Sequence, residues 1–389
     1  MSEGSSRLPG MREPLTGIDR TRRDQSITAC CLAAAAVGDI DVPAARRGRL
    51  LMDCLGVLIA AHPVGRGPSM AQLRSGLGQP VRQLLPDDLP AGRIGDVVLV
   101  DSAGQLSDEA RDLCVEHLVP SAAMDEHWSW AWVSAEQEER RVYETLRRLR
   151  EKDYSRARGL LVKVPAGELG SLRRRWDGLL GQLGLYEPIS GWMWCQLRGY
   201  WFACPVCRWP MRVRTGAVWD VRCEAHARDG VIYTCEVGGR AGRAPKLQPA
   251  GAQAAMVKAI PATADHYAVS RTVWRYMTLP GLLECELRDY ARSLKATVTM
   301  WPHKDRYDLK IRLHRRVWKL DAKAWVSAVK LGDALRETEP AEPGLIIVIP
   351  DHQHGSRELL QDMIGRQGYR VLTASGLKAE LDKVNEARR

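Results

Sequence analysis

Two acidic residues and a lysine near the C-terminus have the spacing of a metal-dependent phosphodiesterase site. Asp308 lies in the segment RYDLKIRL, and thirteen residues later Asp321 and Lys323 lie in WKLDAKAW. In an extended strand, side chains alternate between two faces, so Asp321 and Lys323 point the same way. Two carboxylates are suitable ligands for Mg²⁺ or Mn²⁺, and the ammonium group can orient water or balance charge on a phosphate. This pattern predicts metal-assisted hydrolysis of phosphodiesters.

A third acid is expected from a helix that precedes these strands, over residues 280–294. Its apolar stripe consists of Leu283, Leu287, Ala291 and Leu294. Glu284 flanks this stripe and is expected to face inward, whereas Glu286 lies on another face and is expected to be exposed. Asp305 competes with Asp308 as a metal ligand, but Asp305 falls in the turn before the strand. Asp308 is therefore the favoured ligand.

The segment around these acids is strongly basic. Residues 295–330 contain ten Lys or Arg and three acids, two of which are the predicted metal ligands. Contacts with nucleic-acid phosphates require such a surface. We predict that Lys310, Arg312 and Arg316 contact the backbone of the substrate without reading its sequence. The net charge of +10 over the whole chain also favours a polyanionic partner.

A second group of residues, with the spacing C-x2-C-x15-C-x2-H, predicts a zinc site. Its members are Cys204, Cys207, Cys223 and His226. Thiolates and imidazole suit tetrahedral Zn²⁺, and four protein ligands leave no open position, so the site is expected to be structural. Zinc binding would contribute on the order of 10 kcal/mol to folding of this module. Cys235 is an alternative to His226 as the fourth ligand.

The length of 389 residues favours two or three domains. Residues 1–135 are expected to form an α-rich N-terminal domain, with residues 1–25 disordered. The apolar run from Ile27 to Val37 is too short to cross a bilayer and is expected to be a buried helix, which places the protein in the cytoplasm. The remaining predicted segments are a helical region at 136–190, a zinc ribbon at 191–240, a linker at 241–272 and the acid-bearing domain at 273–389.

The expected order of elements in the last domain indicates an α/β fold. A helix is followed by three strands, and the two further strands each follow a helix, with a helix at the end. Helices are predicted at residues 280–294, 325–337, 356–366 and 377–386, and strands at 296–301, 307–313, 317–323, 345–349 and 369–372. Upstream, a helix is expected from Ala166 to Leu183 and a strand from Val97 to Val100.

The order of Glu284 on a helix, Asp308 on a strand and Asp321-x-Lys323 on the next strand resembles the PD-(D/E)xK restriction-endonuclease-like superfamily. The resemblance implies an αβββαβ core in which Asp308 and Asp321 lie on a bent, exposed pair of strands. It also implies that Glu284, Asp308 and Asp321 organise Mg²⁺ while Lys323 assists the attacking water. Tyr307 stands where the pattern of the superfamily has proline.

A narrower resemblance covers residues 136–381. The segments ETLRRLREKDYSRARGLLVKVP, CPVCRWPM, LPGLLECELRDYARSL, YDLKIRL, WKLDAKAW and LIIVIPD are similar to those of the restriction endonuclease encoded beside prokaryotic PIWI-RE proteins. That family implies a DNA-cleaving subunit of an anti-phage module with a PIWI-like partner and a helicase. His226 departs from the more common fourth cysteine of its zinc motif. The resemblance does not cover residues 1–135.

Two other classes of function compete with this interpretation. One is a non-catalytic zinc-ribbon protein that binds DNA or acts as a scaffold, and the other is an RNA nuclease or a repair exonuclease. The presence of all four motif positions favours an active enzyme. Because cutting both strands usually needs two active sites, a homodimer is also expected.

Overall fold

The computed structural model describes most of the chain beyond its first 16 residues. The described residues are 17–38, 44–107, 109–110, 113–114, 141–177, 179, 184–214, 219–227, 229–235, 243–252, 254–325, 327–338, 340 and 342–387. They fall into two compact units. The first unit comprises residues 1–132, 325–340 and 358–368, and the second comprises residues 133–324, 341–357 and 369–389.

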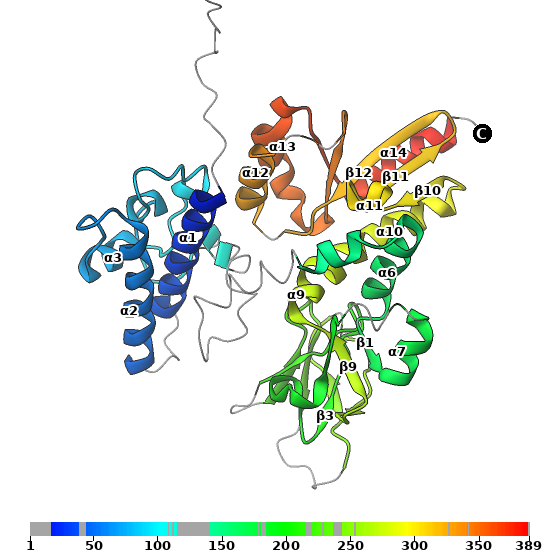
Figure 1. The fold of residues 1–389 in the computed structure, drawn as a ribbon, viewed down its shortest axis with the longest axis horizontal. Helices are drawn as coiled ribbons and strands as arrows, with labels where there is room; N and C mark the ends of the chain where they lie inside the picture. Colours follow the sequence, from blue (N-terminus) through cyan, green and yellow to red (C-terminus); the bar gives the residue numbers. More distant parts are fainter. Residues whose placement is uncertain are drawn as a thin grey trace, which may run out of the picture. The chain divides into compact units, whose positions relative to one another are not determined.

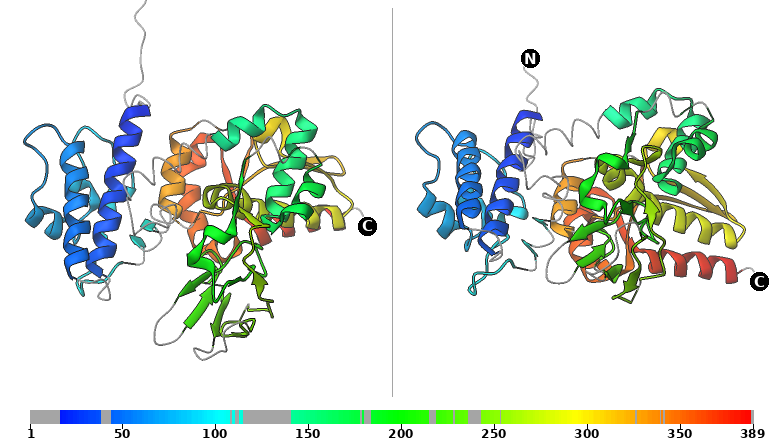
Figure 2. Two further views of the ribbon diagram at one scale, coloured as in Figure 1. Left: turned by 60° about the horizontal axis from the view of Figure 1, so that its bottom comes forward. Right: turned by 90° about the horizontal axis from the view of Figure 1, so that it is seen from below.

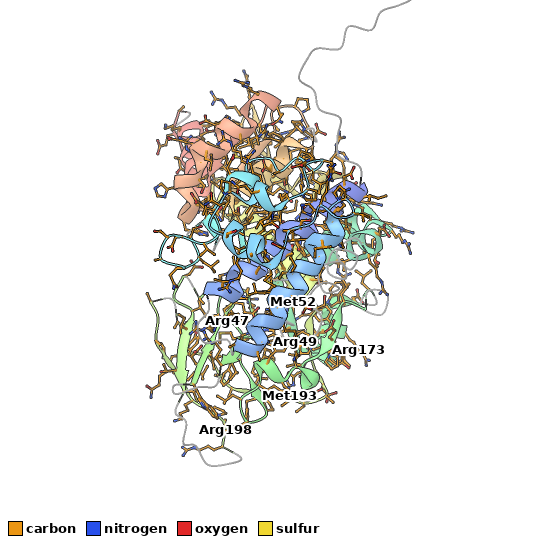
Figure 3. The ribbon with its side chains drawn as sticks, turned by 90° about the vertical axis from the view of Figure 1, so that its left-hand side faces the viewer. Arg47, Arg49, Met52, Arg173, Met193 and Arg198 are labelled. Carbon is orange, nitrogen blue, oxygen red and sulfur yellow. The ribbon has the colours of Figure 1, made fainter. Side chains whose placement is uncertain are left out.

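The first unit is mainly helical. Its elements are α1 (Gly17–Gly38), α2 (Ala44–Ala61), α3 (Met70–Gly76), the 3-10 turns η1 (Val81–Leu84) and η2 (Ile94–Asp96), α12 (Ala328–Arg336) and most of α13 (Arg357–Ile364). α1 and α2 lie side by side (Figure 1). Their core includes Ile27 and Leu32 of α1, so the prediction of a buried helix over this apolar run is confirmed. The exposed face of α2 carries Arg49 and Met52 (Figure 3).

Two expectations for this unit are wrong. Residues 17–25 are helical rather than disordered because α1 begins at Gly17, while residues 1–16 lie outside the described part of the chain. Residues 97–100 form isolated bridges in place of a strand, with Val98 opposite Pro80 and Val100 opposite Leu106. Among the described residues, no helix is both long and apolar enough to span a membrane.

The second unit contains three small sheets around the predicted zinc motif. Their strand orders are β1-β9-β2, β3-β8 and β4-β5-β6-β7, all antiparallel. The strands are β1 (Ala166–Glu168), β2 (Tyr186–Pro188), β3 (Tyr200–Trp201), β4 (Arg212–Arg214), β5 (Trp219–Arg222), β6 (Ile232–Cys235), β7 (Leu247–Pro249), β8 (Ile260–Pro261) and β9 (His266–Val269).

These strands correct two predicted segments. Residues 241–272 do not form an unpatterned linker, because β7, β8 and β9 each complete one of the small sheets. The helix expected from Ala166 to Leu183 is shorter, since β1 comes first and α7 (Leu169–Trp176) follows it. α7 stops where Asp177 takes a left-handed conformation with φ of 46°.

The five-stranded sheet of the second unit has the order β10-β11-β12-β13-β14. Its strands are β10 (Thr297–Met300), β11 (Leu309–Leu313), β12 (Arg316–Ala322), β13 (Ile346–Ile349) and β14 (Arg370–Thr373). The first three strands are antiparallel neighbours, and β12, β13 and β14 run parallel. All four residues of β13 are buried, as expected for a parallel strand covered on both faces.

Two helices cover one face of this sheet. α10 (Leu279–Ser293) contributes Leu283, Leu287 and Ala291 to its core, and α14 (Ala374–Glu386) contributes Leu377 and Leu381. Figure 2 shows α14 running along the strands. α10 continues directly from α9 (Arg271–Val273) and the π-helical turn η5 (Trp274–Thr278). The further helix α6 (Glu151–Lys163) packs against α10.

Candidate active site and metal centre

The two strand acids are neighbours at one end of the β11–β12 pair. Leu309 lies opposite Leu320 in the ladder, and the backbone N–H of Asp308 donates to the carbonyl of Leu320 at 3.0 Å. The register therefore brings Asp308 beside Asp321. The Oδ2 atom of Asp308 accepts the N–H of Ala322 at 2.6 Å, which turns this carboxylate toward the end of β12.

Asp308 is buried, with 8% of its surface exposed, so the expectation of an exposed strand pair is wrong for this residue. Burial raises the pKa of Asp308 well above its usual range, and the nearby Glu284 and Asp321 raise it further. The repulsion among these carboxylates indicates a site that a cation would stabilise.

Lys323 contacts the second strand acid directly. Its Nζ atom lies 2.9 Å from Oδ1 of Asp321, and its backbone N–H donates to the carbonyl of Val348 in β13 at 2.8 Å. The sheet thus holds the backbone of Lys323, and its half-buried side chain extends toward Asp321. Burial alone would lower the pKa of Lys323, but Asp321 and Asp308 raise it, so the ammonium form predominates.

Glu284 faces inward from α10 as predicted and is fully buried, whereas Glu286 is exposed. Arg158 of α6 lies 3.3 Å from Oε1 of Glu284, and the indole N–H of Trp301 donates to Oε2. Burial raises the pKa of Glu284 to about 7, although Arg158 opposes that rise. Glu284 is therefore held by protein donors on both oxygens.

Asp305 belongs to the same buried network. Its Oδ2 atom accepts the hydroxyl of Tyr154 at 2.9 Å and lies 3.5 Å from Nε of Arg158. Its Oδ1 atom is buried without a hydrogen-bond partner. The preference for Asp308 over Asp305 remains a prediction, but Asp305 is a neighbour of the site and not a solvent-exposed turn residue.

The charges of this network fit a divalent cation. Glu284 interacts electrostatically with Asp305, Arg158 and Lys323, and Asp308 interacts with all three other carboxylates and with Lys323. A bound Mg²⁺ or Mn²⁺ ion would favour the ionised forms of Asp308 and Glu284, whose pKa values are raised in its absence. In the described part of the chain, these carboxylates do not form a set of three with ligand atoms all within 4.8 Å. The pair Asp308 and Asp321 is sufficient, because Mg²⁺ is usually bound through one or two carboxylates.

The open face of the sheet next to this site is basic. Lys310 and Arg312 alternate with buried residues along β11, and Lys310 lies directly opposite Lys319 of β12. Like charges in that position are destabilising on their own. Glu342 partly offsets the repulsion through an ion pair with Lys319 at 2.8 Å. A bound polyanion would offset it further.

Arg316 lies at the other end of β12, beside a basic hollow. The hollow has a volume of about 560 Å³ and is lined by His314, Arg315, Arg316, Lys383, Val384 and Ala387. Five residues of strand separate Arg316 from Asp321, which corresponds to roughly 17 Å. Because an odd number of positions separates the two residues, Arg316 points to the opposite face of the sheet from Asp321, on the side of α14, whereas Lys310 and Arg312 share the face of the acids.

The predicted zinc ligands gather at one point. The ligand atoms of Cys204, Cys207, Cys223 and His226 all lie within 4.8 Å of one another. Cys207 and Cys223 have sulfur atoms 3.7 Å apart, and Nδ1 of His226 lies 3.3 Å from the sulfur of Cys223. Tetrahedral Zn²⁺ with Zn–S bonds of about 2.3 Å would place two sulfurs about 3.8 Å apart. The spacing therefore fits zinc, and this set contains His226 but not Cys235.

A stack of tryptophans supports the metal centre. Trp209 and Trp274 stack with ring centroids 4.3 Å apart, and the indole N–H of Trp274 donates to the sulfur of Cys207 at 3.4 Å. Trp192 and Trp194 extend the stack. This arrangement links the knuckle at Cys207 to the turn η5, which leads into α10.

The sequence reasoning missed two residues of the acidic network. Arg158 was not singled out, because an arginine in an Arg-rich helix is usually exposed. Its position between Tyr154 and Leu161, both buried, is the one signal that it faces inward. Trp301 was seen only as the end of a strand. Its φ of 49° turns the chain so that the indole reaches Glu284.

Comparison with known families assigns the C-terminal part of the chain to a class of nuclease-related proteins. The family model that matches residues 281–389 is described as "REase associating with pPIWI_RE". The narrower resemblance, to the restriction endonuclease encoded beside PIWI-RE proteins, is thus confirmed over this segment. The segment contains Glu284, Asp308, Asp321 and Lys323. A search of the curated proteins and a search of the solved structures each gave no match.

Proposed function

We propose that this chain is a Mg²⁺- or Mn²⁺-dependent DNA endonuclease of the PD-(D/E)xK type. The observation that carries the proposal is the meeting of Asp308, Asp321 and Lys323 at the end of one strand pair, beside a buried Glu284. The order of α10, three antiparallel strands, α12 and β13 agrees with an αβββαβ core. The family match over residues 281–389 supports the same assignment.

The proposed mechanism assigns a role to each residue. Asp308 and Asp321 would hold the metal ion, which supplies Lewis acidity and lowers the pKa of a bound water. The ammonium group of Lys323 is positioned by Asp321 and can donate to the attacking water or to a phosphate oxygen. Glu284 lies near Asp308, and its carboxylate would add to the negative potential of the site once a bound metal ion favours its ionised form.

The basic strand pair supports a nucleic-acid substrate. Lys310 and Arg312 share the face of β11 that leads away from Asp308, and they would contact phosphates next to the scissile one. Arg316, at the far end of β12 and on the opposite face, is proposed as a more distant phosphate contact. These residues would position the duplex, while the acids act on the scissile phosphate.

The zinc centre is proposed to be structural. With Cys204, Cys207, Cys223 and His226 as ligands, Zn²⁺ would have no open position for chemistry. Its place is among four short strands and the tryptophan stack, where it would join turns that are far apart in sequence and stabilise the surrounding buried core.

We further propose that the chain acts in a cytoplasmic anti-phage module with a PIWI-like protein and a helicase. The name of the matching family supports the PIWI-like partner. The first unit is the proposed docking region. Met52 and Ile59 of α2 are 59% and 50% exposed and lie two turns apart on one side of the helix. Replacing both with glutamate should abolish co-purification with the PIWI-like protein, and persistent co-purification would contradict this assignment.

A cleavage assay tests the central proposal. Purified chain, alone and with the PIWI-like partner, is incubated with duplex DNA, single-stranded DNA and RNA in Mg²⁺ or Mn²⁺. Duplex cleavage that is lost in D321N and K323A is expected. Cleavage that survives both substitutions, or that occurs equally in EDTA, would show that the site lies elsewhere. Cleavage of RNA alone would show that the substrate is RNA and not DNA. Products trimmed from the ends would indicate an exonuclease.

A further inference from the structure

A buried arginine from outside the family-matched segment has no role in the mechanism above. Arg158 of α6 is 1% exposed, although its side chain carries a full charge. A buried charge is tolerated when it is paired and hydrogen-bonded. Arg158 meets this condition through two carboxylates, Glu284 at 3.3 Å and Asp305 at 3.5 Å, and through a hydrogen bond to the carbonyl of Met277.

The guanidinium group is held from several sides. The carbonyl of Met277 belongs to the π-helical turn η5, which directly precedes α10. The plane of Trp301 lies on another side, with its ring centroid 5.6 Å from the guanidinium carbon of Arg158. α6 and α10 approach closely at this level. Val162 of α6 lies so near Gly281 of α10 that a Cβ atom added at Gly281 would clash with it. Val162 follows Arg158 by one helical turn, so both side chains face α10.

The turn that carries Trp301 and Asp305 is also attached to α6. Trp301, His303, Lys304 and Asp305 all have positive φ angles, between 49° and 72°. Such a conformation is costly for residues other than glycine and persists when surrounding contacts hold it. Two contacts from α6 do so, since Glu151 accepts the backbone N–H of His303 at 3.0 Å and Tyr154 donates to Asp305.

These contacts fix the orientation of Glu284. Arg158 occupies one carboxylate oxygen, and Trp301 occupies the other. Both oxygens of Glu284 are thus engaged by donors, and the same guanidinium group contacts Asp305 on its other side. We infer that Arg158 is a positioning residue of the active site, which holds Glu284 in place behind Asp308 and separates it from Asp305. This inference rests on the proposed nuclease function.

The inference has a structural consequence for the family-matched segment. Residues 281–389 supply the four motif residues, whereas α6 supplies the cation that holds one of them. The active site is therefore assembled from two parts of the chain that are more than a hundred residues apart in sequence.

The test is a double-mutant cycle in the full chain. The variants are R158M, E284Q and R158M/E284Q, with R158K as the conservative replacement. Arg156, two residues away on α6, provides the matched control R156M, because its side chain is 44% exposed and pairs with Asp177. For each variant, kcat and KM for duplex cleavage are measured below the onset of unfolding, and the thermal midpoint is recorded separately.

If Arg158 acts through Glu284, R158M lowers kcat on the order of tenfold to a hundredfold with little change in KM, and adding R158M to E284Q costs little more. R158K is expected to recover part of kcat, and R156M to match the unmodified protein. Unchanged kcat in folded R158M, or losses that multiply in the double variant, would overturn the inference.

The thermal midpoints provide a reading that does not depend on activity. R158M leaves Glu284 buried without its cation, so it should lower the midpoint more in the unmodified background than in E284Q. Equal decreases in both backgrounds would overturn the inference. If the unmodified protein fails to cleave, or if D321N still cleaves, the proposed function fails instead, and the thermal cycle still decides whether Arg158 and Glu284 form a pair.

Discussion

The contact between α6 and α10 yields a quantitative prediction at Gly281. A Cβ atom added at Gly281 would lie 2.2 Å from Cγ2 of Val162, whereas ordinary contacts begin at 3.4 Å. The Gly281→Ala substitution would thus require the two helices to separate locally by roughly 1.2 Å. Overpacking of this kind costs about 1 to 3 kcal/mol, and the higher helix propensity of alanine returns up to about 1 kcal/mol.

We therefore expect Gly281→Ala to lower the free energy of unfolding of the second unit by about 1 to 2 kcal/mol. For a unit of this size, each kcal/mol lowers the thermal midpoint by about 2 to 4 °C. Activity should fall more than stability suggests. Arg158 is one turn from Val162, and a misplacement of about 1 Å near an active site can cost a hundredfold in rate. Differential scanning calorimetry and the duplex-cleavage assay measure the two effects.

Two further variants separate this explanation from a general effect of alanine. Gly281→Ala combined with Val162→Ala removes the clash and should recover both stability and cleavage relative to Gly281→Ala alone. Gly56 of α2 has nothing within 4 Å of its added Cβ atom, so Gly56→Ala should stabilise the first unit by up to about 1 kcal/mol. The reasoning is refuted if Gly281→Ala is as stable as the unmodified protein, or if the second substitution restores nothing.

Outcomes are also expected for five other substitutions. Cys204→Ser should reduce bound zinc from about one ion per chain to near zero, as measured by atomic absorption. Asp321→Asn should abolish cleavage while leaving duplex binding within a few fold, and Lys323→Ala should lower kcat on the order of a hundredfold or more. Arg316→Ala should reduce the slope of log affinity against log salt by about one. Burial raises the pKa of Cys30 to about 12, so its contribution to stability is complete below its unfolded pKa and lost as the pH rises toward 12. Cys30→Ala should therefore flatten the loss of stability of the first unit over that range.

Three of these predictions have a control or an outcome that would contradict them. Cys235 lies outside the ligand cluster, so Cys235→Ser should retain zinc. Loss of the ion in that variant would indicate that Cys235 is the fourth ligand. Equal salt slopes for Arg316→Ala and the unmodified protein would remove Arg316 from the substrate path. An unchanged alkaline transition in Cys30→Ala would assign that transition to other groups.

The elements of the C-terminal sheet were predictable because each carries a local pattern. Leu309, Ile311 and Leu313 alternate with polar residues on β11 and are buried. The apolar run of β13 is bounded by loops and is buried throughout. Predicted and observed limits of α10, β11 and β12 differ by two residues or fewer. The spacing of apolar residues along the sequence indicates which side chains are buried, and that spacing differs between a helix and a strand.

The small sheets around the zinc motif had no such pattern. β8 has two residues and β7 has three, which is too short for alternation to appear. Their pairing partners are far away in sequence, since β9 pairs with β1 about a hundred residues earlier. Spacing of ligands identified the metal centre, but only tertiary pairing identifies the strands between residues 241 and 272.

The abundance of tryptophan acquires a physical reason from the structure. The chain has 13 Trp and one Phe, and several buried indoles use their N–H group as well as their apolar surface. Trp274 donates to the sulfur of Cys207, Trp209 to the carbonyl of Val269, and Trp301 to Glu284. Phenylalanine is smaller and has no N–H group, so it would leave each of these acceptors without its donor. In each of the two candidate centres, a buried tryptophan donates its N–H group to one of the polar residues. Trp274 lies in the turn that leads into α10, and Trp301 donates to Glu284 of α10, so both tryptophans are linked to this helix.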